Sequence, residues 1–214
     1  MIRNKQKKIA IIYEGEKTEK NLFQNLAQHF FAEKANILLV TLPAAGNLYM
    51  LWTKLQEDDF ETDVISVLKE MNKDISKQLK DIEVEDFSEI YLFFDYDGHH
   101  DNIPQALKGK DALKEMLQTF NNETELGKLY ISYPMIESIK EISVKMQDYQ
   151  TFYLPLEECG DYKEKVGGVS DYSDFRHITK EMWYTACNAS RKRASIIVCY
   201  KEETDYYNFI NTIT

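Results

Sequence analysis

Several features are scarce or missing in this chain of 214 residues, and each absence excludes a class of protein. The three cysteines, Cys159, Cys187 and Cys199, show no CxxC spacing, so the sequence predicts reduced thiols instead of a disulfide framework. No apolar run approaches the roughly 18 residues that a membrane span needs. The apolar run after the basic start covers only Ile9 to Tyr13, which is too short for a signal peptide. We therefore expect a soluble, cytoplasmic protein with no membrane partner.

The chain also lacks internal repeats, low-complexity tracts and a convincing linker. The segment KVGGVS (residues 165–170) has two glycines but not the GxxxxGKS/T spacing of a P-loop, so no ATP site of that kind is predicted. With 43% hydrophobic residues the chain can bury a proper core. The expected organisation is a main domain over residues 1–150 and an extension over 151–214 packed on the same domain.

The charge balance is acidic, with a formal net charge of -10. This balance argues against non-specific binding of nucleic acid through a basic surface. The acids are dense over residues 56–89, while basic clusters occur at Arg3–Lys8 and at Arg191-Lys192-Arg193. An enzyme of this composition that acts on nucleic acid would need metal ions, local basic patches or a basic partner.

Hydrophobic patterning predicts an α/β fold, because strand-like and helix-like segments alternate. We expect about four to five strands in a mainly parallel sheet flanked by helices. The predicted strands are 9–13, 35–42, 90–94 and 128–133. Helices are predicted from Thr18 as N-cap, over 48–55, 64–82 and 106–120, and from Pro134 onward. After residue 149 the pattern predicts a strand, a long loop and a helix over 178–189, and it leaves 194–200 open between strand and helix.

Acidic residues follow two of the predicted strands. Glu14 comes directly after the first, and Asp95 and Asp97 come after the strand at 90–94. Ligands of open parallel sheets bind at the carboxyl ends of the strands. If the two strands are neighbours, the three carboxylates converge and need a cation, and such hard oxygen ligands suit Mg²⁺ or Mn²⁺. Gly15 and Gly98 would let the backbone turn tightly beside them.

A strand ending in Glu-Gly, followed much later by a strand ending in Asp-x-Asp, resembles the Toprim pattern. The fuller string EGEKTEKNLF (residues 14–23) looks like the first motif of the RloB and OLD-like abortive-infection branch. Pro134 and Glu137 are similar to that branch's later Pro-x-x-Glu element. The resemblance spans roughly residues 8 to 140 and requires the helical segment at about 57–86, which is expected to be acidic, to be an insertion.

This resemblance implies a Toprim-like domain with Mg²⁺-dependent nuclease activity on DNA or RNA. Glu14 would be a metal ligand or general acid/base, Asp95 and Asp97 would hold the metal, and Glu137 would complete a second site. It further implies a phage-defence effector that works with a separate ABC-type ATPase. Homo-oligomerisation stays open. Phosphodiester cleavage needs a metal to stabilise charge on phosphoryl oxygens and to activate water.

Two other functions stay open. The string YLFFDYDG (residues 91–98) also resembles the haloacid-dehalogenase phosphatase motif, with Asp95 as nucleophile and Asp97 as acid/base, although that motif normally lies near the N-terminus. Alternatively, the fold is a non-catalytic module for assembly or sensing.

Individual residues also have simpler interpretations. Asp95 and Asp97 are ordinary turn residues, and Glu19 and Glu137 sit where a helix N-terminus favours acids. The candidates for contacts to nucleic acid are Lys17, Arg191, Lys192 and Arg193, for which a solvated surface is the alternative.

Overall fold

The computed structural model describes residues 7–15, 17–33, 37–44, 46–96, 112–132, 135–142, 162–167 and 170–199. The chain divides into two compact units, Met1–Ser132 and Tyr133–Thr214. The division falls earlier in the chain than the boundary expected at residue 150. None of the described helices is long and apolar enough to cross a membrane.

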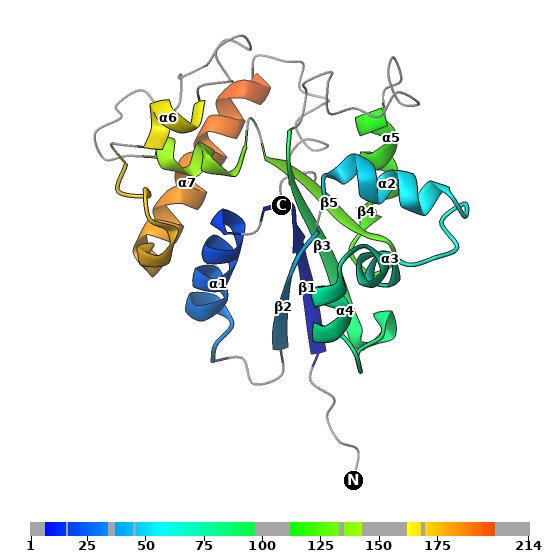
Figure 1. Ribbon diagram of the computed structural model, residues 1–214. Helices are drawn as coiled ribbons and strands as arrows, with labels where there is room; N and C mark the ends of the chain where they lie inside the picture. Colours follow the sequence, from blue (N-terminus) through cyan, green and yellow to red (C-terminus); the bar gives the residue numbers. More distant parts are fainter. Residues whose placement is uncertain are drawn as a thin grey trace. The chain divides into compact units, whose positions relative to one another are not determined.

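The first unit is built on a five-stranded sheet with the strand order β2-β1-β3-β5-β4 (Figure 1). All neighbouring strands are parallel except β4 and β5, which are antiparallel. The predicted α/β class with a mainly parallel sheet flanked by helices is thus confirmed. The strands are β1 (Lys7–Tyr13), β2 (Ile37–Pro43), β3 (Phe87–Asp95), β4 (Asn121–Asn122) and β5 (Gly127–Ser132).

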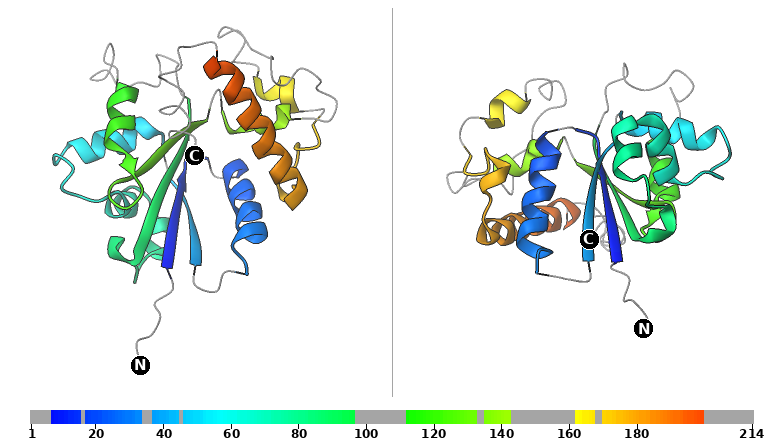
Figure 2. Two further views of the ribbon diagram at one scale, coloured as in Figure 1. Left: turned by 180° about the vertical axis from the view of Figure 1, so that it is seen from behind. Right: turned by 60° about the horizontal axis from the view of Figure 1, so that its bottom comes forward.

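Helices cover the two faces of this sheet unequally, as both views in Figure 2 show. Among the helices of the first unit that the structure describes, one packs on one face and four pack against the other. The lone helix is α1 (Thr18–Phe30), and the four are α2 (Leu48–Gln56), α3 (Val64–Met71), α4 (Lys73–Gln78) and α5 (Ala112–Thr119).

The sequence of β1 explains why the sheet needs cover on both sides. Its alternate residues enter two separate hydrophobic clusters: Ala10 and Ile12 on the four-helix face, Ile9 and Ile11 on the α1 face. A strand buried on both faces reads as a continuous apolar run, as this one does. Each fully buried large aliphatic side chain stabilises the fold by about 1.5–3 kcal/mol.

The prediction of one continuous helix over residues 64–82 is wrong in one respect. The segment forms two helices, with a break at Asn72. Asn72 is extended (φ -134°, ψ 111°), and its side chain accepts hydrogen bonds from the N–H groups of Asp74 and Ile75 at 2.9 and 3.3 Å. An Asn N-cap therefore starts α4 where α3 ends. The apolar spacing did not reveal the break because both helices bury residues in the same core.

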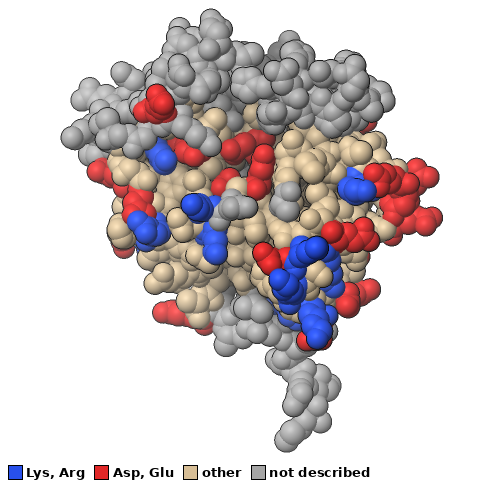
Figure 3. Space-filling model, viewed as in Figure 1, with Lys and Arg blue, Asp and Glu red and all other residues tan. Residues whose placement is uncertain are grey.

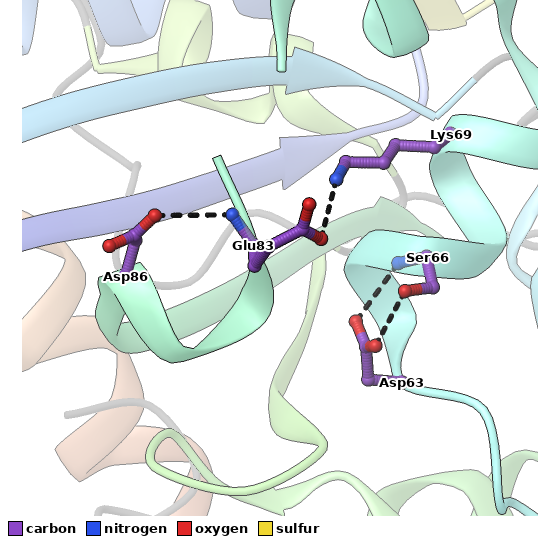
Figure 4. Close-up of polar contacts among 5 residues, drawn as sticks. All are labelled: Asp63, Ser66, Lys69, Glu83 and Asp86. Carbon is purple, nitrogen blue, oxygen red and sulfur yellow. Dashed lines mark hydrogen bonds and ion pairs between the residues drawn. The ribbon is translucent and has the colours of Figure 1, made fainter. Parts of the chain in front are cut away.

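Polar contacts fix the ends of α3 (Figure 4). Asp63 caps it by accepting from the backbone N–H and the hydroxyl of Ser66 at 2.9 and 2.6 Å. Near its other end, Lys69 pairs at 2.9 Å with Glu83, the residue that precedes the short 3-10 helix η1 (Val84–Asp86). These contacts tie α3 to the start of β3.

The segment 57–86 is acidic as expected, but its helices do not carry most of the acids. Residues 64–80 contain more basic than acidic side chains. The basic ones are Lys69, Lys73, Lys77 and Lys80, and the acidic ones are Glu70 and Asp74. The acids gather instead in the connection between α2 and α3 (residues 57–63) and after residue 80. Figure 3 shows basic side chains gathered over α4 and acidic ones over the end of α2.

The N-terminal boundary of α1 differs slightly from the prediction. Thr18 is the first helical residue, and the N-cap position belongs to Lys17, whose side chain makes no capping hydrogen bond. The predicted helix over 106–120 is present as α5 from Ala112, and its earlier part lies outside the described residues.

The described part of the second unit is helical. It contains η3 (Ile136–Glu141), α6 (Tyr162–Gly167), η5 (Phe175–His177) and α7 (Lys180–Cys199). The helix expected after Pro134 is a 3-10 helix in its described part, and Pro134 itself lies outside the described residues. The open segment 194–200 is helical as far as Cys199, where α7 ends.

Candidate active site

Glu14 and Asp95 meet at the carboxyl edge of the sheet. Glu14 follows β1, and Asp95 is the last residue of β3. The two strands are neighbours and parallel, with Tyr13 paired to Phe93. Both residues are half-buried, and both line one small open pocket. Residues far apart in the sequence are thus brought together as the strand-end pattern predicts.

The remaining pocket residues come from the four-helix side and from the neighbouring strand. Leu48 and Tyr49 belong to the first turn of α2, Leu113 to α5 and Ile131 to β5. Tyr96, the residue after Asp95, completes the lining. The pocket therefore has an acidic part and a part of aliphatic and aromatic side chains.

Backbone hydrogen bonds hold the strand ends that carry the two acids. The N–H of Tyr96 donates to the carbonyl oxygen of Ser132 at 2.9 Å and extends the β3–β5 pairing past Asp95. The N–H of Ala44 donates to the carbonyl oxygen of Tyr13 at 2.7 Å, directly before Glu14. The acids therefore lie on rigid strand ends, which is the support that a functional site requires.

Gly15 has a different role from the expected one. Among the described glycines, a positive φ occurs at Gly127 and not at Gly15. A side-chain carbon at Gly15 would instead come within 3.0 Å of the Glu19 carboxylate. Glu19 lies in the first turn of α1, as expected, but it is only 9% exposed. Gly15 is thus required for the close approach of a buried carboxylate to the turn beside Glu14.

Glu19 also affects the neighbouring tyrosine. Burial raises the pKa of the Tyr13 phenol, a hydrogen bond with the Thr41 side chain opposes this, and the negative charge of Glu19 raises the pKa further. Tyr13 stacks on Phe23 of α1 with ring centroids 5.5 Å apart. From the sequence, Glu19 was expected only to be an acid in the first turn of a helix. The sequence pattern did not predict that Glu19 is buried against Gly15.

Within the described part of the first unit, the other predicted site residues do not line this pocket. Asp97 lies outside the described residues, as does Gly98. Lys17 is exposed at the start of α1. Glu137 belongs to the second unit, where it is buried in the first turn of η3.

The three basic residues of α7 have unequal environments. Arg191 and Lys192 are exposed. Arg193 is 23% exposed, and its Nη1 lies 2.6 Å from a carboxylate oxygen of Glu141, which is only 2% exposed. Glu141 also accepts a hydrogen bond from the hydroxyl of the buried Tyr162. Arg193 therefore holds α7 to η3, and sequence patterning gave no signal for Glu141.

The described residues supply two of the three carboxylates that were expected to hold Mg²⁺. No group of three His, Cys, Asp or Glu residues within the described ranges is placed to hold a metal ion. Glu14 and Asp95 supply two carboxylates at one pocket. Mg²⁺ sites of enzymes that act on phosphates use one or two carboxylates, with waters and substrate oxygens completing the shell, so this pair fits such a site.

Comparison with known proteins gives no relative. No protein-family model matches the chain, and neither a curated protein nor a solved structure matches it.

Proposed function

We propose that this protein is a Mg²⁺- or Mn²⁺-dependent nuclease of the Toprim type, which cleaves phosphodiester bonds in DNA or RNA. One observation carries the proposal: Glu14 and Asp95 end neighbouring parallel strands and line the same pocket. Their order along the chain and their Glu-Gly and Asp-x-Asp contexts match the Toprim pattern. Asp97 joins them in this proposal because it is two residues beyond Asp95.

In the proposed mechanism Glu14, Asp95 and Asp97 would hold the metal ion, and Glu14 would also be the candidate for moving a proton at the attacking or leaving oxygen. The metal supplies charge stabilisation at the phosphoryl oxygens and an activated water. The chain positions the acids through the backbone bonds of Tyr13 and Tyr96. Glu19 is buried with its carboxylate close to Gly15, the residue that follows Glu14.

Titration calorimetry with Mg²⁺ and Mn²⁺ tests the metal site. Wild type should bind the ion, and Asp95→Ala and Asp97→Ala should each lose binding. Glu85→Ala, an exposed acid in η1, is the matched control and should bind as wild type does. Loss of cleavage by the same two variants, measured on DNA, tRNA and other RNA, would link the site to activity. Equal metal affinity of wild type and Asp95→Ala would refute the proposed site.

A phosphatase is the second candidate, because Asp95 ends the central strand of the five. An aspartyl nucleophile at that position would form a phosphoenzyme and release an alcohol. Acid-quench trapping of phosphate on wild type but not on Asp95→Asn would favour this alternative. Absence of both metal binding and trapping would favour a non-catalytic module for assembly or sensing.

A biological role follows from the same resemblance. We place the nuclease in prokaryotic phage defence, where it would work with a separate ABC-type ATPase, since the sequence has no P-loop spacing. Co-purification with such an ATPase and stimulation of cleavage by ATP would support this role. ATP-independent cleavage by the isolated chain would argue against it.

A further inference from the structure

The basic run of α7 has no part in the proposed metal chemistry, and its three residues differ in what they contact. Arg193 lies against the buried carboxylate of Glu141, at 2.6 Å. Arg191 and Lys192 are exposed, and no acid within the described residues pairs with either side chain. These two cations are therefore accessible to an anion from solution.

Arg191 shares one side of α7 with other exposed residues. Lys180, Tyr184, Asn188 and Arg191 follow one another at spacings of four, four and three residues, which places them on the same side of the helix. Lys192 flanks this side. All five residues are exposed, and Tyr184 is 56% exposed. We call these five residues the α7 face.

The charge of the helix is opposite to that of the chain. α7 carries four basic residues and one acid, Glu181, whereas the whole chain has a net charge of -10. A polyanion is thus repelled by the protein as a whole and attracted locally at α7. From Lys180 to Arg191 the face extends about 16 Å along the helix axis. A strand of DNA carries one phosphate for about every 3.4 Å, so several phosphates can contact the face at once.

We propose that the α7 face binds the phosphodiester backbone of the nucleic-acid substrate, with Arg191 and Lys192 on phosphates and Tyr184 packed on a sugar or a base. Cations combined with an exposed aromatic side chain are how proteins bind single strands irrespective of sequence. The inference rests on the proposed function, because it takes the partner to be the substrate of the nuclease. It deepens that function by naming a surface that binds the substrate without a metal ion.

The experiment measures how the full chain binds a fluorescein-labelled single-stranded DNA of about 20 nucleotides and mixed sequence. Anisotropy titrations are made in EDTA, so that neither metal binding nor cleavage contributes, at KCl concentrations from about 50 to about 200 mM. The double variant Arg191→Met, Lys192→Met should flatten the plot of log K against log[KCl] by about 1.4, which is about 0.7 for each lost phosphate contact. At about 0.1 M KCl this loss corresponds to roughly 25-fold weaker binding.

Tyr184 should contribute a part that does not depend on salt. Tyr184→Ala should weaken binding by about 5- to 100-fold, which corresponds to the stacking of one base, and should leave the slope against log[KCl] unchanged. Tyr184→Phe keeps the ring and should bind within about twofold of wild type. An unchanged affinity of Tyr184→Ala would overturn the placement of Tyr184 on the strand.

The matched control removes two exposed lysines elsewhere. The double variant Lys73→Met, Lys80→Met changes the net charge by the same amount in the first unit and should bind within about twofold of wild type. If it weakens binding as much as the α7 double variant does, total charge decides the affinity and the inference is overturned. Absence of oligonucleotide binding by wild type overturns it as well. So does a loss, in the α7 double variant, of binding to vesicles of phosphatidylserine and phosphatidylcholine with unchanged DNA binding, because the face would then bind a membrane.

Failure of this inference is distinguishable from failure of the proposed function. If Asp95→Ala abolishes Mg²⁺ binding but the α7 double variant binds DNA as wild type does, the metal site stands and the α7 face is refuted. If DNA binding depends on the α7 face but no Mg²⁺ binds to wild type, the face stands and the metal-dependent nuclease is refuted.

Discussion

Two groups of acids in this molecule differ in what surrounds them. In the first unit Glu14 and Asp95 are half-buried and line an open pocket. In the second unit Glu141 is 2% exposed and receives both the guanidinium of Arg193 and the hydroxyl of Tyr162. The Glu141 carboxylate is satisfied by the protein itself, while the pocket acids are placed where an external ligand can reach them.

The comparison shows how the surroundings of a buried, paired acid differ from those of an acid beside an open pocket. A buried carboxylate is tolerated only when a cation and hydrogen bonds replace its bound water. The carboxylate then links the segments that supply these partners. The half-buried acids beside the open pocket keep part of their contact with water and remain accessible to a ligand. The expected effects of substitution differ accordingly.

The largest expected effect comes from Arg193→Met, which leaves the buried Glu141 without its cation. Breaking one side of a buried ion pair costs about 3–5 kcal/mol, and the partial exposure of Arg193 places the expected loss near the lower end. Urea unfolding followed by tryptophan fluorescence measures it. The chain has two tryptophans, Trp52 in α2 and Trp183 in α7, so a Trp52→Phe background reports on the second unit alone.

Arg191→Met is the matched control for that substitution. It removes the same side chain from an exposed position two residues away. The free energy of unfolding should change by no more than about 0.5 kcal/mol. Similar losses for the two variants would mean that the Arg193–Glu141 pair is not what holds α7 to η3.

Tyr162→Phe should have the next largest effect. It removes one hydroxyl and keeps the ring, so the loss isolates the hydrogen bond to the buried carboxylate. Hydrogen bonds to charged groups contribute about 1.5–3 kcal/mol. The same Trp183 fluorescence assay gives the value. A neutral result would show that Arg193 alone satisfies Glu141.

Gly15→Ala should destabilise the first unit by about 1–2 kcal/mol, because the added methyl group displaces the Glu19 carboxylate. A Trp183→Phe background leaves Trp52 as the reporter of this unit. Gly46→Ala is the control: its methyl group would approach the sulfur of Met50 at 2.8 Å, but Met50 is 50% exposed and can move away. Equal effects at both glycines would remove the special role assigned to Glu19.

The smallest expected effect is stabilisation by Mg²⁺. At a concentration ten times the dissociation constant, binding to the folded state adds about 1.4 kcal/mol to the free energy of unfolding of the first unit. Trp52 fluorescence should report this gain in wild type and not in Asp95→Asn. Trp183 should report none, because Glu141 already has a protein cation. If Mg²⁺ raised the free energy of unfolding reported by Trp183 and not the one reported by Trp52, the ion would bind to the second unit and not at the pocket acids of the first.

The sheet and the meeting of Glu14 with Asp95 were predictable because they depend on local signals. Continuous apolar runs mark the buried parallel strands, and a parallel sheet brings strand ends to one edge. The break at Asn72 was not predictable from periodicity, since a cap changes the backbone without changing which residues are buried. Glu141 was not predictable either, because its partners Tyr162 and Arg193 are distant in sequence and nothing local marks a pairing between them.

The order of the strands also has a consequence for how the molecule avoids aggregation. The two edges of the sheet are β2, with seven residues, and β4, with two. An edge strand is a template for another chain, and a very short one is a poor template. The β4 edge is therefore blunted. The β2 edge is longer within the described residues, and its last residue, Pro43, has no backbone N–H to offer to another strand.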